Sequence, residues 1–599
     1  MFYADAGNGK DGIKMSGMTS IYVGVSGIHA AQTALNTTAH NLANVYTPGY
    51  TRQLAFSSDK RYSTYSRNSN GIMQVGLGVN ASSTSRVRSL LLDLRYRKEV
   101  GRQGFYDAQY EAVSEVQTLI GELEGVRFQE SLENLWGAIS EMAKTPDSLV
   151  YRSELVMNAE MFLDRAKSIY DELIGYQKNL NTKVQETVDV INAYGEEINE
   201  LNKQISGYEA AGEAANDLRD RRDLLLDKLS NLINISYVEE ENHYVTVKAE
   251  GVPFVTEGGV FHMETAELDA DKGSNYLSCI WPHLDNQEVF NLTEEISTAN
   301  KNDIGTLKGY LLARGDFVGK YTDVDATKQE NYDLTTPQGQ ADYQAALDFY
   351  NRNVDCSVIV KTQSLFDALI NGIVTTINDI LSPTTTEVPD GVTSFTDADG
   401  NVYQAGTVKI LDMNTSTGDD GKMPPEELFS RAETKRFIEV TGDDGNTYYM
   451  YNEYNTFGKE SLYTLSNISM NQTIVENYDK LPFKTLEGDN DMAKGQQLVE
   501  AWDLKFANLD PDNTTKLTFK EYYKEMMYSI GNTGNLYQSI ALNQYTTASQ
   551  VDEARTQITG VSSEEELANM IRFQSAWDAS SRYVTTIAEM LEYIIEKLG

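Results

Sequence analysis

Both ends of this chain carry apolar residues at the seven-residue spacing of helices that pack along a seam. Near the N-terminus these residues are Ile21, Val25, Ile28, Leu35, Ala39 and Leu42. Near the C-terminus they are Leu567, Met570, Trp577, Val584, Ile587, Leu591, Ile594 and Leu598. A lone helix with such a stripe is marginal in water, so each stripe requires a partner within the chain or on a neighbouring subunit.

The N-terminal stripe predicts a helix over residues 20–45 that ends at a defined turn. Proline disfavours the α region for the residue before it, and the following glycine supplies the positive φ of a type II turn. Two asparagines lie just before the break, where such a side chain can hydrogen-bond the local backbone as the helix unravels. The residues of this helix-terminating turn are Asn41, Asn44, Pro48, Gly49 and Tyr50.

In the middle of the chain, the spacing of the apolar residues changes several times. Helical spacing extends from Val87 to Leu232 with a break near Thr145-Pro146, and its length indicates a rod-like antiparallel or coiled-coil domain. Residues 54–85 and 234–300 instead combine β-forming residues with turn residues. Helical spacing returns from Leu365 to Leu381 and is followed by a segment dense in Thr, Gly, Asp and Tyr.

The predicted fold class is therefore α+β and multidomain, with a long coiled-coil-like helical core formed by both termini and inserted β-rich outer domains. The expected division is a disordered leader (1–17), a terminal coiled-coil domain (18–60 plus 555–599), a long helical domain (61–233 plus 301–382 plus 476–554), a small β domain (234–300) and an inserted variable β domain (383–475). The leader is glycine-rich and without pattern, so both Met1 and Met18 are candidate starts.

Charge and cysteine content exclude several classes of function. The 599 residues include 50 Lys+Arg and 89 Asp+Glu, a formal net charge of −39 at pH 7. A field of that sign repels phosphate backbones and anionic head groups, so we expect no nucleic acid and no membrane insertion. No apolar run reaches the ~18 residues of a membrane span, and no secretory signal precedes the first helix. Two cysteines, Cys279 and Cys356, exclude a disulfide framework.

The sequence offers little for catalysis. Its five histidines (His29, His40, His243, His262 and His283) are scattered, and no HExxH, GxSxG, Walker A or GxGxxG pattern occurs. We expect no enzyme, no catalytic residue and no cofactor.

One segment imitates a calcium loop. Residues 510–521 place oxygen atoms at loop positions 1, 3, 5, 9 and 12, but Thr515 occupies the position where the turn needs glycine. A helix start after a polar loop explains the same residues, and calcium binding stays an open question at this point. We predict no metal site.

Apolar stripes usually face a core, but these two lie at opposite ends of a long acidic chain whose middle is rich in β-forming segments. That plan suits a rod built by stacking subunits. The predicted assembly interface consists of Ile21, Ile28, Leu35, Leu42, Trp577, Val584, Ile587, Leu591, Ile594 and Leu598.

Several segments resemble a known family. GIHAAQTALNTTAHNLANVYTPGYTRQ (27–53) and EEELANMIRFQSAWDASSRYVTTIAEMLEYIIEKL (564–598) resemble the terminal signatures of bacterial flagellar rod, hook and hook-associated proteins, the flagellar axial protein family. Within that family, four further segments resemble the hook-associated protein 1 family, the first hook–filament junction proteins. They are LGVNASSTSRVRSLLLDLRYR (77–97), ANDLRDRRDLLLDKLSNLINISYV (215–238), GTLKGYLLARGD (305–316) and LTFKEYYKEMMYSIG (517–531).

The resemblance implies a structural protein of the bacterial flagellum, exported unfolded by the flagellar type III apparatus without a cleaved signal and incorporated between hook and filament. It implies an extracellular location on the flagellum. The implied partners are like subunits in a ring, the hook protein, the second hook–filament junction protein and an export chaperone.

Three alternatives stay open at this stage. A hook or distal-rod protein of the same axial family would share both terminal motifs but not the segment ANDLRDRRDLLLDKL, and a flagellin-like junction protein is the next alternative. The β-rich insert at 383–475 is also compatible with a surface-displayed carbohydrate-binding or hydrolytic module, although its acidic pairs Asp419-Asp420 and Asp443-Asp444 show no arrangement for acid/base work.

Overall fold

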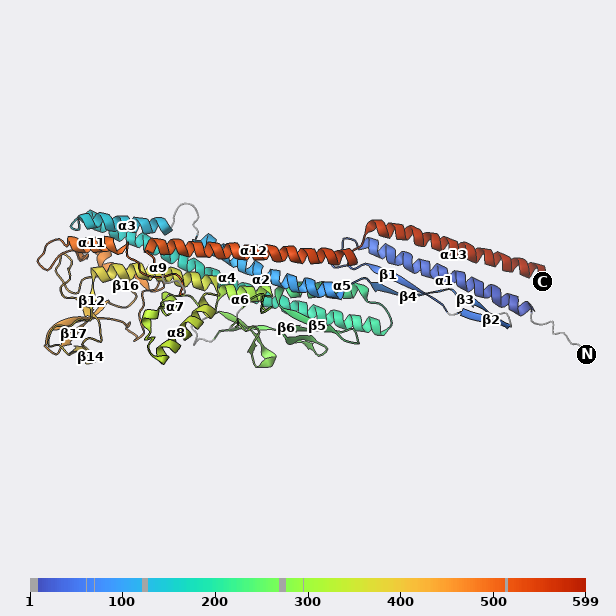
Figure 1. Ribbon diagram of the computed structural model, residues 1–599, viewed down its shortest axis with the longest axis horizontal. Coiled ribbons are helices and arrows are strands. Elements are labelled where there is room, and N and C mark those ends of the chain that lie inside the picture. The colour runs from blue at the N-terminus through green and yellow to red at the C-terminus, as the bar shows by residue number, and fades with distance from the viewer. Residues whose placement is uncertain are drawn as a thin grey trace, which may run out of the picture.

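The protein is a long rod with its terminal helices paired at one end (Figure 1). The computed structural model describes residues 9–60, 62–68, 71–120, 128–268, 276–292, 294, 296–511 and 515–598. Helices α1 (Gly9–Ala43) and α13 (Ser563–Leu598) pack side by side in opposite directions. The helical body forms the middle of the rod, and a β-rich insert lies at the end opposite the terminal pair.

Long helices build the body. Their bounds are α2 (Leu90–Ile120), α3 (Phe128–Lys144), α4 (Leu149–Ala210), α5 (Asn216–Leu232), α6 (Thr306–Arg314), α7 (Tyr321–Asp325), α8 (Pro337–Phe349), α9 (Val358–Leu381), α10 (Gln472–Glu476), α11 (Met492–Ala501) and α12 (Phe519–Thr559). Helix α4 alone is 62 residues long, and its buried residues recur every three or four positions from Arg152 to Ile205. Helices α2 and α12 pack along each other beside it.

The largest apolar core lies in this body. Phe128, Phe162, Phe366 and Tyr522 are among its fully buried side chains, and the Phe128 and Phe366 rings pack edge to face with centroids 5.0 Å apart. Most of the folding energy from apolar burial therefore belongs to the body rather than to the terminal pair.

Helix α9 is long and apolar enough to cross a membrane by length and composition. In this fold its apolar side chains are buried in the core of the body. Leu365, Phe366, Leu369 and Ile373 are at most 1% exposed, and the helix contacts α4, α7, α11 and α12.

The strands form three groups along the rod. The first follows α1 and consists of β1 (Gln53–Asp59), β2 (Tyr62–Asn68), β3 (Gly71–Gly76) and β4 (Val79–Arg86), with β1 and β4 paired and packed on α1. The second packs on α4 and consists of β5 (Ile235–Glu239), β6 (Val245–Ala249), β7 (Val252–Thr256), β8 (Gly259–Val260), β9 (Glu264–Glu267), β10 (Leu277–Trp281) and β11 (Gln287–Glu288). Its strand orders are β5-β6-β7-β8 and β11-β10-β9.

The third group is the insert after α9. It consists of β12 (Thr384–Thr385), β13 (Ser394–Asp397), β14 (Val402–Gln404), β15 (Ile410–Leu411), β16 (Phe429–Arg431), β17 (Phe437–Gly442), β18 (Thr447–Tyr451) and β19 (Ile468–Met470). The main sheet has the order β12-β15-β18-β17-β13-β14, and β16 pairs with β19. The chain is thus α+β and multidomain, with long terminal helices and inserted sheets, as its sequence predicts.

Two local expectations are tested by the structure. Helix α1 begins at Gly9, inside the segment 1–17 that was expected to be a disordered leader, while residues 1–8 lie outside the described residues. In the segment that imitates a calcium loop, Thr518 and Glu521 form the capping box of α12, with Glu521 N donating to Thr518 Oγ1 over 3.3 Å. Residues 512–514 of that segment also lie outside the described residues.

Two glycines on α4 provide a matched test of this packing. A Cβ at Gly195 would lie 2.5 Å from Cζ of the buried Phe254, whereas a Cβ at Gly207 meets nothing within 4 Å. Gly195→Ala should therefore lower the free energy of unfolding by about 1–3 kcal/mol through overpacking. Gly207→Ala should raise it by about 0.5–1 kcal/mol, because alanine has the higher helix propensity. Urea unfolding followed by tryptophan fluorescence checks both, and equal effects would contradict the packing of β7 on α4.

Candidate functional site

Three short segments meet where the terminal pair adjoins the body. Residues 50–53 lead from α1 into β1, while residues 87–89 and 560–562 are the two connections to the body, from β4 to α2 and from α12 to α13. They are joined by backbone hydrogen bonds, because Arg52 N donates to Thr559 O over 2.8 Å and Val87 N donates to Arg52 O over 2.9 Å. We call these segments, together with α5, Asn41 at the end of α1 and Glu566 at the start of α13, the neck.

Helix α5 presents a row of carboxylates to the neck. Asp217, Asp220, Asp223 and Asp227 are three or four residues apart, which places them on one face of the helix. Asp217 accepts a hydrogen bond of 2.8 Å from Gln53 Nε2. Asp220 accepts one of 2.9 Å from the backbone nitrogen of Thr51, so the chain leaving α1 is fastened to α5 twice.

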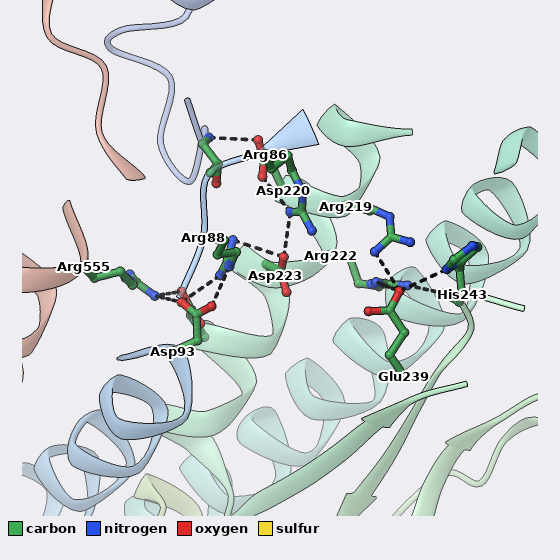
Figure 2. A network of polar contacts seen from close by, with 12 residues as sticks. Arg86, Arg88, Asp93, Arg219, Asp220, Arg222, Asp223, Glu239, His243 and Arg555 are labelled. Carbon is green, nitrogen blue, oxygen red and sulfur yellow. Dashed lines mark hydrogen bonds and ion pairs between the residues drawn. The ribbon is translucent and has the colours of Figure 1, made fainter. Parts of the chain in front are cut away.

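Asp223 lies at the centre of the row. Arg86 Nη1 approaches it to 2.8 Å, Arg88 Nη1 to 3.1 Å and Arg97 Nη2 to 3.3 Å. Figure 2 shows Arg86 and Arg88 directed toward this carboxylate. The three arginines come from the end of β4, from the connection after it and from α2, so one carboxylate joins three segments of the chain.

The last acid of the row joins the end of α12. Asp227 Oδ2 lies 2.6 Å from Arg555 Nη1, and Arg555 also lies 3.7 Å from Asp93 at the start of α2. The Arg555 guanidinium stacks over the Tyr96 ring at 3.9 Å from its centroid.

The other side of α5 holds the small β region. Arg222 Nη1 donates to His243 O over 2.8 Å and to Asn202 Oδ1 over 3.0 Å, and Arg219 Nη1 lies 2.7 Å from Glu239 (Figure 2). Helix α5 is therefore the element to which the terminal pair, α2, α12 and the second strand group are all attached.

These ion pairs are largely buried, so the loss of one partner would affect the stability of the fold. The side chains of Arg97, Asp223 and Arg86 are 4%, 14% and 12% exposed. Burial alone would favour the neutral acid at Asp223, but the neighbouring Arg88, Arg86 and Arg97 outweigh it and lower the pKa of Asp223 to about 2. Removing one partner from such a cluster leaves an uncompensated buried charge, which is strongly destabilising.

Asn41 is the second polar centre of the neck. Its side chain is 1% exposed, and Nδ2 donates to Gln53 O over 2.9 Å and to Glu566 Oε2 over 3.2 Å. Oδ1 accepts from Tyr50 Oη over 2.8 Å and from Gln53 N over 3.0 Å. The sequence-based expectation that Asn41 bonds the unravelling backbone of its own helix is therefore wrong, because its partners come from the turn, β1 and α13.

The remaining turn residues form hydrogen bonds within the turn itself. Asn44 Nδ2 donates to His40 O over 3.0 Å, and Tyr50 N donates to Thr47 O over 3.2 Å across the exposed Pro48. Gly49 has φ +78°, the value that the third residue of a type II turn requires. This part of the prediction is confirmed.

The acidic first turn of α13 pairs with the chain that leaves α1. The Glu566 side chain is 2% exposed, and its Oε1 lies 2.8 Å from Arg52 Nε. Its neighbour Glu565 also pairs with Arg52, at 3.0 Å, yet is 64% exposed. Glu566 thus closes the neck between the end of α1 and the start of α13.

The seam between α1 and α13 is lined by small residues. A Cβ at Gly24 would lie 2.5 Å from Val584 Cγ2, and a Cβ at Gly27 would lie 2.7 Å from Ser580 Oγ. The buried residues of this line are Gly24, Ala31, Ala34, Thr38 and Asn41.

The predicted N-terminal interface residues flank that line. Ile28, Leu35 and Leu42 each directly follow one of its residues, and with Ile21 they are partly exposed.

On α13, the predicted residues Trp577, Val584, Ile587, Leu591 and Ile594 are partly buried, and the side chain of Leu598 lies outside the described residues. Apolar side chains remain on other faces of this helix, because Ile571, Met590, Tyr593 and Ile595 are 56–67% exposed. The structure of a single chain does not cover them.

The described residues of the neck form no recognisable catalytic arrangement. A cavity of about 300 Å³ lies between the turn after α1, α5 and the end of α12, and its charged residues Asp227, Asp552, Arg555 and Arg88 are paired with one another or with neighbours. Among the residues that the structure describes, no group of three or more His, Cys, Asp or Glu could hold a metal ion. The arrangement holds segments of chain together.

Asp223 provides a direct test. Asp223→Asn should lower the free energy of unfolding by about 3 kcal/mol at pH 7, because it leaves buried guanidinium groups without their anion. The native-state pKa of about 2 lies below the ordinary value of 3.8, so this contribution is present above pH 4 and is lost as the pH falls toward 2. Urea unfolding at pH 7 and at pH 2.5 measures it.

The matched control is Asp189→Asn, at an exposed position of α4. It should change the unfolding free energy by less than about 0.5 kcal/mol at either pH. If Asp223→Asn behaved like the control at pH 7, the neck would not depend on this carboxylate.

Sequence comparison assigns the three regions of the chain. Residues 113–386 match the family described as "Flagellar hook-associated protein FlgK helical domain". Residues 21–51 match "Flagella basal body rod protein", and residues 555–597 match "Flagellar basal body rod FlgEFG protein C-terminal".

Similar proteins extend over nearly the whole chain. Flagellar hook-associated protein 1 of Bacillus subtilis is 24% identical over 97% of this chain and 99% of its own length, and that of Salmonella typhimurium is 22% identical over 95% and 98%. The solved structure of the flagellar hook junction protein FlgK from Burkholderia pseudomallei covers 78% of this chain and all of its own, with 12% identity and a TM-score of 0.46. The helical body, the terminal segments and the full-length relatives agree: the chain belongs to the FlgK family of flagellar hook-associated proteins and is a structural component of the bacterial flagellum.

Proposed function

We propose that this protein forms the junction between the flagellar hook and filament, as a ring of like subunits joined through their terminal helices. The observation that carries the proposal is the apolar surface of α13 that its pairing with α1 leaves exposed, including Met590, Tyr593 and Ile595. A helix with apolar side chains on several faces is typical of a helix buried between neighbours. A second copy supplies such neighbours.

The relatives support the position within the flagellum. Proteins named flagellar hook-associated protein 1 align with 95–97% of this chain, including the helical body, which matches the family described as a FlgK helical domain. The hook protein and the second hook–filament junction protein are then the axial neighbours. As part of the same proposal, the protein is exported through the flagellar type III apparatus. An export chaperone binds its C-terminal helix before assembly.

The arrangement of the rod supports a radial order in the assembly. The terminal pair would form the innermost layer, the helical body with the strand group at 234–300 the next shell, and the insert at 383–475 the outside. The insert supports this order because it lies at the end of the rod opposite α1 and α13. Its distance from the terminal pair leaves it free to vary without disturbing assembly.

Addition of a subunit would be driven by ordering of the terminal pair. In a single chain the large apolar side chains of this seam are only partly buried, and others on α13 stay exposed, so pairing of α1 with α13 leaves apolar surface that further neighbours would cover. We propose that their distal parts stay poorly ordered in the free subunit and zip together against neighbours on incorporation. Partial disorder beforehand would limit premature polymerisation.

Location tests the assignment. Immunogold electron microscopy of the native bacterium should show a single band where hook meets filament. Label along the whole hook would instead indicate a hook protein, and label on the cell body alone would contradict a junction role.

Replacement of one seam residue tests the assembly mechanism. Leu591→Asp should abolish incorporation and motility, because it places a charge where α13 must be buried. Leu42→Asp should act in the same way. The middle of the chain should keep its melting transition in both variants, measured by circular dichroism.

Val402→Asp is the matched control, since it also replaces an apolar side chain by Asp, and Val402 is 65% exposed in the insert far from the terminal pair. It should leave flagellation within about twofold of the parent, as expected for an exposed surface substitution. Normal filaments from Leu591→Asp would contradict the assembly mechanism.

A further inference from the structure

We infer that the neck is a register clamp, which fixes how α1 and α13 are aligned before their distal parts order. This inference rests on the proposed ordering of the terminal pair during assembly. It assigns Asn41 and Glu566 as positioning residues for that step, acting on the seam rather than on the neighbouring subunit.

Polar residues at the neck are fully buried, whereas the large apolar residues of the distal seam are not. Asn41, Thr51, Gln53 and Glu566 are between 1% and 6% exposed. Most apolar side chains of the distal seam are only partly buried. Order should therefore persist at the neck under conditions that free the distal helices, because local stability follows local burial and hydrogen bonding.

One contact at the neck determines the alignment of the whole pair. Asn41 meets Glu566, and moving 14 residues back along α1 and 14 forward along α13 brings Gly27 opposite Ser580, which are also in contact. Because both helices rise about 1.5 Å per residue, fixing one end fixes the other.

The seam itself specifies this alignment weakly. The α1 line repeats small side chains at alternating spacings of three and four residues, so a slip by one heptad would bring similar side chains together. A buried asparagine in such a line sets register, because only one alignment supplies its partners. Asn41 occupies that line and finds Glu566 only in the observed register.

The clamp is attached to the body and not to a neighbour. Thr51 and Gln53 bond Asp220 and Asp217 of α5, and Arg86 joins Asp220 and Asp223. All of these partners belong to the same chain. The clamp can therefore exist in the free subunit, before any ring is formed.

Cross-linking of the full-length protein tests the register directly. A Cβ at Gly27 would lie 3.4 Å from Ser580 Cβ, close to the separation in a disulfide. Oxidation of Gly27→Cys/Ser580→Cys should give the in-register bond. Gly27→Cys/Ile587→Cys, which requires a slip of one heptad, should give at least about tenfold less, with linked peptides identified by mass spectrometry.

Removal of the clamp should abolish this preference. With Glu566→Ala added, the slipped pair should form to within about threefold of the in-register pair, because Asn41 loses its partner across the seam. With Glu565→Ala added, the preference should stay, since that carboxylate also pairs with Arg52 but is 64% exposed. Unchanged preference in Glu566→Ala would overturn the clamp.

Hydrogen exchange separates this inference from the proposed function. In the free wild-type subunit, amides of residues 41–53 should exchange at least about tenfold more slowly than those of 21–34. Glu566→Ala should remove that protection while the amides of α4 stay unchanged. Slow exchange throughout α1 would contradict the proposed disorder but leave the clamp standing, whereas a fast-exchanging wild-type neck would overturn the clamp itself.

Discussion

Glycines let two helices approach closely, and polar contacts at one end can then fix how the pair is placed. The terminal pair of this protein meets at Gly24 and Gly27, and polar contacts fasten its inner end to the body. The carboxylates of α5 receive the chain leaving α1, the chain leaving β4 and the end of α12. Without them, two long helices would be tied to the body by two short connections alone, residues 87–89 and 560–562.

The charges at the neck illustrate how an acidic chain uses its arginines. Across a protein of net charge −39, Arg86, Arg88, Arg97 and Arg555 gather against the acidic face of α5. Buried ion pairs gain little net stability over apolar packing, but each requires its own partner. Such a cluster favours one arrangement over others, which suits a joint that must hold a defined geometry between two helical units.

Sequence reasoning located the helices, the turn at Pro48 and the strand groups because these follow from periodicity and turn chemistry. It named the large apolar residues of α1 as the assembly interface, which stays a prediction, and it did not single out Gly24 and Gly27, which lie against α13. A heptad pattern draws attention to large side chains, so the small residues of a close helix pair are easily passed over. The partners of Asn41 and Glu566 were also missed, since they lie 525 residues apart in the chain. The regular acids of α5 were the available signal, and they resembled a solvated helix face.

In the assembled flagellum, α1 and α13 of one subunit should pair in the observed register. Electron cryomicroscopy of the native hook–filament junction, at a resolution that shows side chains, would reveal this pairing. We expect α1–α13 pairs to line the innermost layer, with Asn41 and Arg52 against Glu566. Terminal helices that pair only between different subunits, or that lie on the outer surface, would contradict it.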